Sequence, residues 1–282
     1  MNIDFKKHFK LRQTEDKLGF VNIPLNTDVE LYIDPLTLSN QKGEWYIKAN
    51  NLIVDFFEEL IGAIKNNDDK KSFYLLSKLR EPNETHFGVS SNMPDGCGIG
   101  EEQALFLLNK LKKSKAVQSG HLKDLSDCEL LINGIGSDKI SDIVTNIIRG
   151  LLIEYTEEQC KYYQIPVRET MSDFFWSSEQ KTWIRRKAML PHFLNKPVIL
   201  VPKNIVRKQT SSNYQNVYER IIEALQEHHL SLNTSLVKVL KNGKRVVSKK
   251  SLKERHKCTK DFVFAYIDAN PEFLAKYKRT RY

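Results

Sequence analysis

The strongest pattern in the chain is a helical repeat of apolar positions between residues 137 and 163. After Ser137, which can cap a helix, apolar side chains recur every three or four residues and therefore fall on one face. The first members of this face are Ile140, Ile143, Val144, Ile147 and Ile148. The pattern continues from Leu151 and stops before Ile165-Pro166, so we expect helix throughout this stretch.

Polar side chains in the same stretch follow two strips beside the apolar face. Asp138, Asp142 and Asn146 lie four residues apart and are therefore neighbours on the helix surface. A second polar row consists of Ser141, Thr145 and Arg149. This concentration of carboxylate and amide groups makes the first strip a candidate site.

Apolar spacing elsewhere predicts further helices and a few short strands. Helices are expected over residues 50–64, 73–79, 101–111, 214–225, 236–240 and 262–267. Strands are expected at residues 31–33 and 198–202, and the second is so apolar that it should lie inside a sheet. Residues 19–25 have an extended pattern, and Asn242-Gly243-Lys244 is typical of a turn or hairpin tip.

These elements predict an α/β or α+β fold, mostly helical around a small sheet, with a basic helical C-terminal portion. We expect the core domain to span residues 1–207 and the basic portion to span residues 208–282. A chain of 282 residues is long enough for each part to bury a core.

Charge is concentrated in one segment. The chain has a net charge of +9, and residues 238–260 alone contain ten Lys or Arg against Glu254, so the rest is close to neutral. A concentrated basic segment favours an anionic partner, DNA or RNA above all, although a solvated basic face is the simpler alternative. The candidates for phosphate contacts are Lys244, Arg245, Lys249, Lys250, Lys253, Arg255 and Lys257.

Several classes of protein are disfavoured. No apolar run approaches the roughly 20 residues that span a bilayer, and the N-terminus lacks the apolar centre of a signal peptide, so we expect a cytoplasmic protein without a membrane partner. Cys97, Cys128, Cys160 and Cys258 are scattered, which argues against a zinc ribbon and against a disulfide framework.

Two further places carry groups suited to chemistry. Asp34 ends the strand at 31–33, where a carboxylate acts either as a metal ligand or as the cap of the following turn. The loop at 81–86 contains two carboxylates, an amide, a hydroxyl and an imidazole, among them Glu84 and His86. Together with the helical strip, these residues form a candidate site of Asp34, Glu84, His86, Asp138, Asp142 and Asn146. Asp34, Glu84 and Asp142 are its candidate ligands for Mg²⁺ or Mn²⁺.

Three short motifs are weaker. The glycines at 96–100 precede a helix whose first turn is acidic, and no Walker Lys-Ser/Thr follows, so a structural turn is favoured over a phosphate cradle. Residues 131–143 resemble the hairpin of helix-hairpin-helix DNA-binding modules, but only Lys139 supplies the basic pattern. Glu179-Gln180-Lys181 matches half of the PD-(D/E)xK nuclease signature without the apolar strand that normally carries it.

A wider resemblance rests on five stretches. Ile33-Asp34-Pro35, EPNETH at 81–86, GIGSDKISDIVTNIIR at 134–149, IEYTEEQC at 153–160 and KPVILVPK at 196–203 resemble a family of uncharacterised bacterial proteins found in defence islands and on mobile elements. The resemblance implies a bacterial, cytoplasmic and antiphage setting. It carries no catalytic residues.

Three functions of different classes follow as hypotheses. The first, which we favour at this stage, is a metal-dependent nuclease, an enzyme that hydrolyses phosphodiesters at the candidate site while the basic segment holds the nucleic acid. The second is a non-catalytic nucleic-acid-binding subunit of a multi-gene defence complex. The third is an interaction module for an acidic protein partner.

Overall fold

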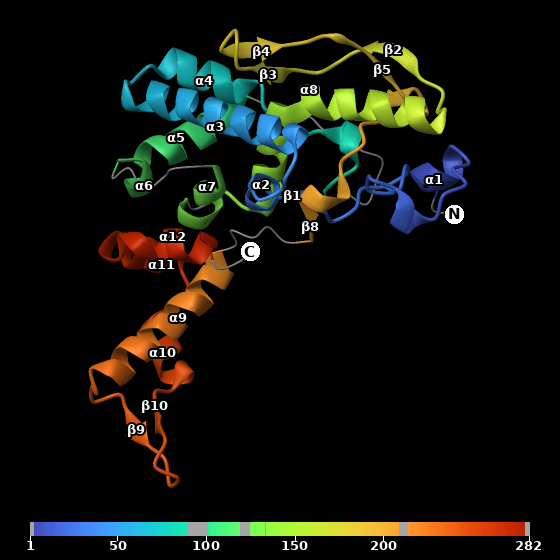
Figure 1. The fold of residues 1–282 in the computed structure, drawn as a ribbon. Coiled ribbons are helices and arrows are strands. Elements are labelled where there is room, and N and C mark those ends of the chain that lie inside the picture. The colour runs from blue at the N-terminus through green and yellow to red at the C-terminus, as the bar shows by residue number, and fades with distance from the viewer. Residues whose placement is uncertain (1–2, 89–100, 119–124, 133, 209–213, 280–282) are drawn as a thin grey trace.

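The computed structural model describes residues 3–88, 101–118, 125–132, 134–208 and 214–279, and these residues form a mostly helical α+β structure. The parts of the chain before and after residues 209–213 are called here the body and the arm (Figure 1). The helices of the body are α1 (Phe5–His8), α2 (Pro35–Ser39), α3 (Glu44–Lys65), α4 (Asp69–Ser77), α5 (Glu101–Lys113), α6 (Lys115–Gln118), α7 (Leu125–Leu131) and α8 (Ser137–Tyr163). The predicted fold class is confirmed.

The helix α8 is the centre of the body. Its predicted apolar face is buried, and the helix packs against α3 and against β1, β3 and β5. Gly150 allows the closest of these contacts, because a Cβ at this position would lie 2.7 Å from Cδ2 of Phe175 in β3. A side chain here would push β3 off the helix.

The strands of the described residues form antiparallel pairs rather than one sheet. The pairs are β1 (Tyr32–Ile33) with β8 (Val206–Arg207), β2 (Arg168–Met171) with β5 (Lys187–Leu190), β3 (Phe175–Ser177) with β4 (Thr182–Ile184), β6 (His192–Phe193) with β7 (Lys196–Pro197), and β9 (Lys238–Val239) with β10 (Arg245–Val246). The hairpin β3–β4 is fixed to α3 by aromatic packing, with the ring centroid of Phe56 5.2 Å from those of Trp176 and Trp183.

Residues 198–202 were predicted to form a buried strand within a sheet. Their burial is confirmed, but they pair with no strand. Val198, Ile199, Leu200 and Val201 are all at most 3% exposed, yet they belong to no strand. Their backbone groups bond to unrelated parts of the chain: the N–H of Ile199 donates to the carbonyl of Glu84, and the carbonyl of Val201 accepts from Val21. An apolar run indicates burial, but it does not determine which partner receives its hydrogen bonds.

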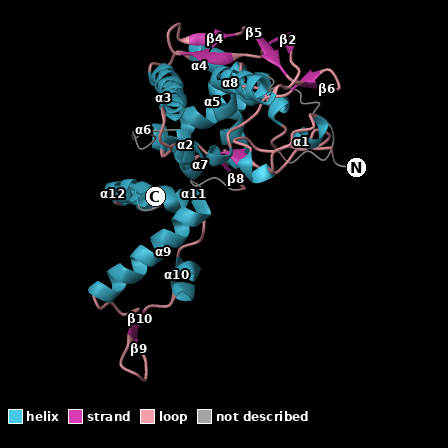
Figure 2. Cartoon of the chain, turned by 45° about the vertical axis from the view of Figure 1, so that its right-hand side comes forward, coloured by secondary structure: helices cyan, strands magenta, loops and turns pink. Residues whose placement is uncertain are grey.

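The arm consists of helices α9 (Tyr214–Ser231), α10 (Lys249–Arg255), α11 (Lys260–Ala269) and α12 (Pro271–Arg279), together with the hairpin β9–β10. The helices α11 and α12 lie beside the body, and α9 leads away from it to the hairpin at the far end (Figures 1 and 2). The helix predicted from Leu236, Val239 and Leu240 is wrong, because these residues flank or enter the hairpin. Gly243 adopts a φ of 77° at its tip, as the turn prediction required.

The arm and the body share one core. Val217, Ile221 and Val263 of the arm belong to the same cluster of buried apolar side chains as the body. Lys260 reinforces the junction, since its Nζ donates to the carbonyls of Ile132 and Ile135 at 2.7 Å each. The predicted boundary at residue 207 therefore separates two parts of the sequence that share one hydrophobic core. Within the described residues, no helix has the length and apolar character needed to cross a membrane.

Candidate functional site

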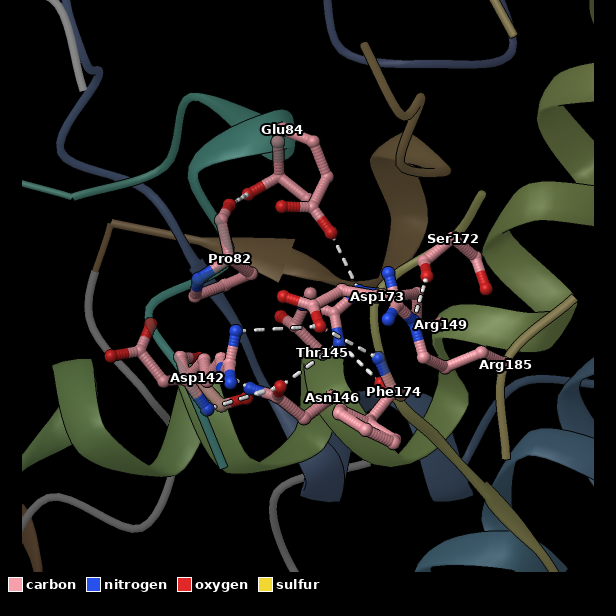
Figure 3. Close-up of polar contacts among 12 residues, drawn as sticks. Pro82, Glu84, Asp142, Thr145, Asn146, Arg149, Ser172, Asp173, Phe174 and Arg185 are labelled. Atoms are coloured by element: carbon pink, nitrogen blue, oxygen red, sulfur yellow. Dashed lines mark hydrogen bonds and ion pairs between the residues drawn. The ribbon is translucent and has the colours of Figure 1, made fainter. Parts of the chain in front are cut away.

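The polar strip of α8 is occupied by internal hydrogen bonds. Asn146 is fully buried; its Oδ1 accepts from the N–H of Arg80 at 3.2 Å and from Nη1 of Arg149 at 2.9 Å. Its Nδ2 donates to the carbonyls of Arg80 at 2.6 Å and Asp142 at 2.7 Å (Figure 3). Two donated and two accepted bonds use the whole capacity of an amide. Asn146 therefore fixes the segment after α4 and has no group left for a substrate.

Arg149 is the centre of this network. It is only 1% exposed, and its Nε donates to Oε1 of Glu84 at 2.5 Å, while Nη1 also donates to the carbonyl of Phe174 (Figure 3). Nη2 is buried without a hydrogen-bond partner among the described residues. The charge of Glu84 is thus neutralised by a buried arginine, so this carboxylate is not free for a metal ion.

Other polar side chains of α8 bond in the same way to backbone groups of β1, of β5 and of the buried segment at 198–201. Oγ of Ser141 accepts from the N–H of Ile33 at 3.0 Å. Oγ1 of Thr156 accepts from Leu200 at 2.9 Å, and Oε1 of Glu157 accepts from Met189 at 2.8 Å. The helix therefore supplies partners for backbone groups that no regular sheet satisfies.

Asp34 is a helix cap rather than an exposed ligand. It is fully buried at the N-terminus of α2, where its side chain accepts from the N–H of Leu36 and from Oγ1 of Thr37 at 2.6 Å. Within the described residues, no three His, Cys, Asp or Glu side chains are grouped so that they could hold a metal ion. The expected ligand set of Asp34, Glu84 and Asp142 is therefore not assembled, because two of its members are engaged elsewhere.

His86 is buried in the loop after the short helix Asn83–Thr85, and its backbone is left-handed with a φ of 55°. Burial lowers the pKa of its imidazole, although a hydrogen bond with the backbone of Thr27 and the charge of Glu84 oppose this shift. Its Nδ1 lacks a hydrogen-bond partner in the described part of the chain. The side chain is thus a neutral, buried group beside Glu84.

A separate group of carboxylates surrounds the first turns of α8. Burial raises the pKa of Asp142 to about 8, and the charges of Asp138 and Glu81 add to the shift while Arg149 opposes it. Burial also raises the pKa of Asp28 to about 6, again with help from Glu81 and Asp138. The charges of Glu81 and Asp138 thus disfavour the ionisation of Asp28 and Asp142, but the four carboxylates do not converge on a common ion position.

The half signature at residues 179–181 lies at the turn between β3 and β4. Lys181 forms an ion pair with Asp55 of α3, and the other oxygen of Asp55 accepts from Nε1 of Trp176 at 2.7 Å. The lysine therefore fastens a hairpin to a helix. The glycines at 96–100 lie outside the described residues.

The structure reveals a cleft that sequence reasoning missed. It has a volume of about 270 Å³, and its polar walls come from Arg80, Glu84, Asp173 and Arg185. These residues belong to three separate segments, so their spacing in the sequence gives no common pattern. No Lys or Arg lies within five residues of Phe174 in the sequence, so no local pattern indicated the cleft.

The basic segment is largely exposed, as a site for an anionic partner requires. Lys244, Arg245, Lys249, Lys250, Arg255 and Lys257 are exposed, whereas Lys253 is partly buried. Lys249 and Lys253 pair with Glu223 at 3.0 Å and with Glu219 at 2.6 Å on α9. Nη2 of Arg245 donates to the carbonyl of Leu230 at 2.8 Å.

The model of the family described as "Domain of unknown function (DUF8370)" matches residues 10–213, and the chain belongs to this family. The match ends immediately before α9, so it covers the body and leaves out the arm. No curated protein and no solved structure matches the chain.

Proposed function

We propose that this member of the DUF8370 family binds nucleic acid through the hairpin β9–β10 and the neighbouring helix α10. The observation that carries the proposal is the exposed positive charge at the far end of the arm. Lys238, Lys241 and Lys244 are exposed there, and no ion pair within the described residues joins any of them to a carboxylate. Lysines that are not paired with a carboxylate can bind a polyanion without first breaking an ion pair of their own.

The shape of the arm supports the same function. A two-stranded antiparallel ribbon fits into the major groove of a DNA duplex, and several DNA-binding proteins read a groove with strands. Apolar side chains in the major groove can contact the methyl group of thymine. Val239 is 69% exposed and Leu240 is 46% exposed on this hairpin, where they face no core. An apolar contact flanked by lysines suits a groove lined by phosphates.

The proposal is binding rather than cleavage. The nuclease hypothesis depended on Asp34, Glu84 and Asp142 meeting at one metal ion, and two of them serve a helix cap and a buried arginine. Binding by the arm requires none of these residues. Of the three functions considered, a non-catalytic nucleic-acid-binding subunit therefore has the best support, and its antiphage setting is part of the proposal because of the sequence resemblance.

The test compares two lysines of the hairpin with two lysines of the body. Lys241→Gln/Lys244→Gln and the control Lys17→Gln/Lys42→Gln each remove two exposed charges. Fluorescence anisotropy with duplex DNA, single-stranded DNA and RNA should show binding that weakens steeply with salt. The hairpin variant should lower the slope of log K against log salt by about 2. The body variant should leave the slope unchanged.

Two results would refute the proposal. One is the absence of binding to all three nucleic acids at low salt. The other is an equal loss of affinity in the hairpin and body variants, which would indicate a diffuse attraction to total charge. Binding to polyglutamate but to no nucleic acid would instead favour the acidic protein partner.

A further inference from the structure

We infer that the cleft between Arg80, Glu84 and Arg185 binds a phosphate monoester. Thr170 and Met171 of β2 and Leu190 of β5 line the cleft. These two strands lie on the side of the body away from the arm (Figures 1 and 2). Its volume of about 270 Å³ is close to the lower limit of roughly 300 Å³ for ligand pockets. It is therefore suited to a small molecule or to the terminal phosphate of a larger one.

The charges around the cleft indicate a doubly negative ligand. Three cations surround the ring of Phe174: Nζ of Lys78 lies 5.0 Å from its centroid, Cζ of Arg185 5.4 Å and Cζ of Arg80 5.9 Å. Asp173 faces Arg80 at 3.8 Å. No ion pair within the described residues connects Lys78 or Arg185 to a carboxylate. Arg185 in the wall of the cleft and Lys78 beside it therefore leave an excess of positive charge, which suits a phosphate monoester carrying about −1.5 to −2 at pH 7.

Glu84 does not cancel this surplus. Although it lines the cleft, its Oε1 is engaged by Nε of Arg149 at 2.5 Å, and that arginine is buried. The buried Nη2 of Arg149 has no hydrogen-bond partner in the described part of the chain, so this donor still lacks an acceptor. The charge of Glu84 is therefore matched by Arg149, so it does not offset the positive charge of Arg185.

Arg185 is positioned for an anion by its own backbone contacts. Its Nε donates to the carbonyl of Ser172 at 2.8 Å, and Ser172 is held in turn by Arg186, whose N–H donates to Oγ of Ser172 at 3.0 Å. This arrangement fixes the guanidinium plane and leaves the two Nη groups, which form the fork that matches phosphate oxygens. The apolar walls at Ile153, Leu190 and Ile199 accommodate the carbon skeleton of the ester.

The experiment is isothermal titration of the full chain with ribose 5-phosphate, with ribose as the uncharged control. Arg185→Gln removes the positioned cation, and Lys187→Gln is the matched control. Lys187 is exposed two residues along the chain and pairs with Glu169 at 2.9 Å, outside the cleft. We expect ribose 5-phosphate but not ribose to bind, Arg185→Gln to weaken binding about tenfold or more, and Lys187→Gln to change it less than about twofold.

A second measurement identifies the source of the phosphate. In the Lys241→Gln/Lys244→Gln background, 5′-phosphorylated and 5′-hydroxyl oligonucleotides are compared. A preference for the phosphorylated end that Arg185→Gln abolishes supports recognition of a nucleic-acid terminus, whereas binding of ribose 5-phosphate alone supports a free metabolite. The inference is overturned if neither ligand binds at millimolar concentration, or if a natively folded Arg185→Gln protein, checked by circular dichroism, binds as the control does. Neither result affects the arm, whose salt dependence is measured separately.

Discussion

The helix α8 and the C-terminal arm both carry many polar side chains, but they use them in opposite ways. In α8, Asn146 and Arg149 are buried and bond to backbone or side-chain groups from distant segments. In the arm, Lys241 and Lys244 are exposed in the turn of the hairpin β9–β10, and this hairpin lies at the far end of the arm (Figure 1). Residue type is therefore a poor guide to role here, and burial separates the side chains that stabilise the fold from those available to a partner.

The difference follows from the way the body is built. Its strands form short pairs, and segments such as residues 198–201 are buried without any ladder to receive their hydrogen bonds. Buried backbone groups that lack partners cost free energy, so side chains must supply those partners. The helix α8 provides them along most of its length. Substitutions in α8 should consequently change stability, whereas substitutions in the arm should change binding.

The largest effect on stability is expected for Arg149→Met. This change keeps much of the side-chain volume but leaves Glu84 partly buried without its cation, and it also removes donors from Asn146 and from the carbonyl of Phe174. Breaking a buried pair in this way costs about 3–5 kcal/mol. Urea unfolding followed by circular dichroism should show a loss of this size.

The matched control is Arg168→Met. Arg168 is exposed on β2, and its Nη1 reaches only Oδ1 of Asn195 at 3.3 Å, so the free energy of unfolding should change by less than about 0.5 kcal/mol. If Arg149→Met is as stable as this control, the network around Arg149 does not hold the body together. The comparison between α8 and the arm would then fail.

A smaller effect is expected from Asp142→Asn, and it should depend on pH. The pKa of Asp142 is raised to about 8 in the folded protein, above the value of about 3.9 for an unfolded chain. Between these pH values the folded state retains a proton that the unfolded state loses. The contribution of Asp142 to stability is therefore greatest below pH 4 and falls as the pH rises toward 8. Removing this ionisable group should therefore raise the free energy of unfolding at pH 8, and by progressively less at lower pH.

Urea titrations at pH 5, 6.5 and 8 would check this prediction. Asp28, whose pKa is raised to about 6, remains in the variant, so part of the slope below pH 6 should persist. Glu154→Gln, an exposed change on the same helix, serves as the control and should follow the parent at every pH. Parallel pH profiles for Asp142→Asn and the parent would show that Asp142 ionises normally. If Mg²⁺ raises the free energy of unfolding of the parent but not of Asp142→Asn, the carboxylate of Asp142 binds a cation.

The sequence predicted the long helices α3, α5, α8 and α9, because their apolar faces repeat over several turns. The repeat that begins at Ile140 correctly predicted α8, and that of Phe56 and Phe57 lies within α3. Short elements were less predictable. Val239 and Leu240 fit a helical spacing by chance, and the turn at Gly243, together with pairing between Lys238 and Val246, determined the hairpin instead.

The sequence indicated which polar residues of α8 and of the loop at 81–86 are unusual, but not their role. The sequence identified Glu84, Asn146 and Arg149 as unusual polar groups, and the structure joins them in one network. It could not show that they are buried, since the segments that cover them have no periodic pattern. The cleft at Arg185 was missed for a related reason, because its walls come together only in the folded chain.

The smallest effect on stability, and the sharpest test of the arm, is expected from Lys249→Gln/Lys253→Gln. These lysines pair with Glu223 and Glu219, and all four side chains are more than a third exposed, so the melting temperature should change by no more than about 2 °C. Their charges are already partly neutralised by α9, whereas those of Lys241 and Lys244 are not. The salt slope for nucleic-acid binding should therefore fall by less than the change of about 2 expected for the hairpin pair, measured by anisotropy from 50 to 200 mM salt. An equal or larger fall would place the bound phosphates along α10 rather than at the hairpin, and the nucleic acid would then lie across the side of the arm.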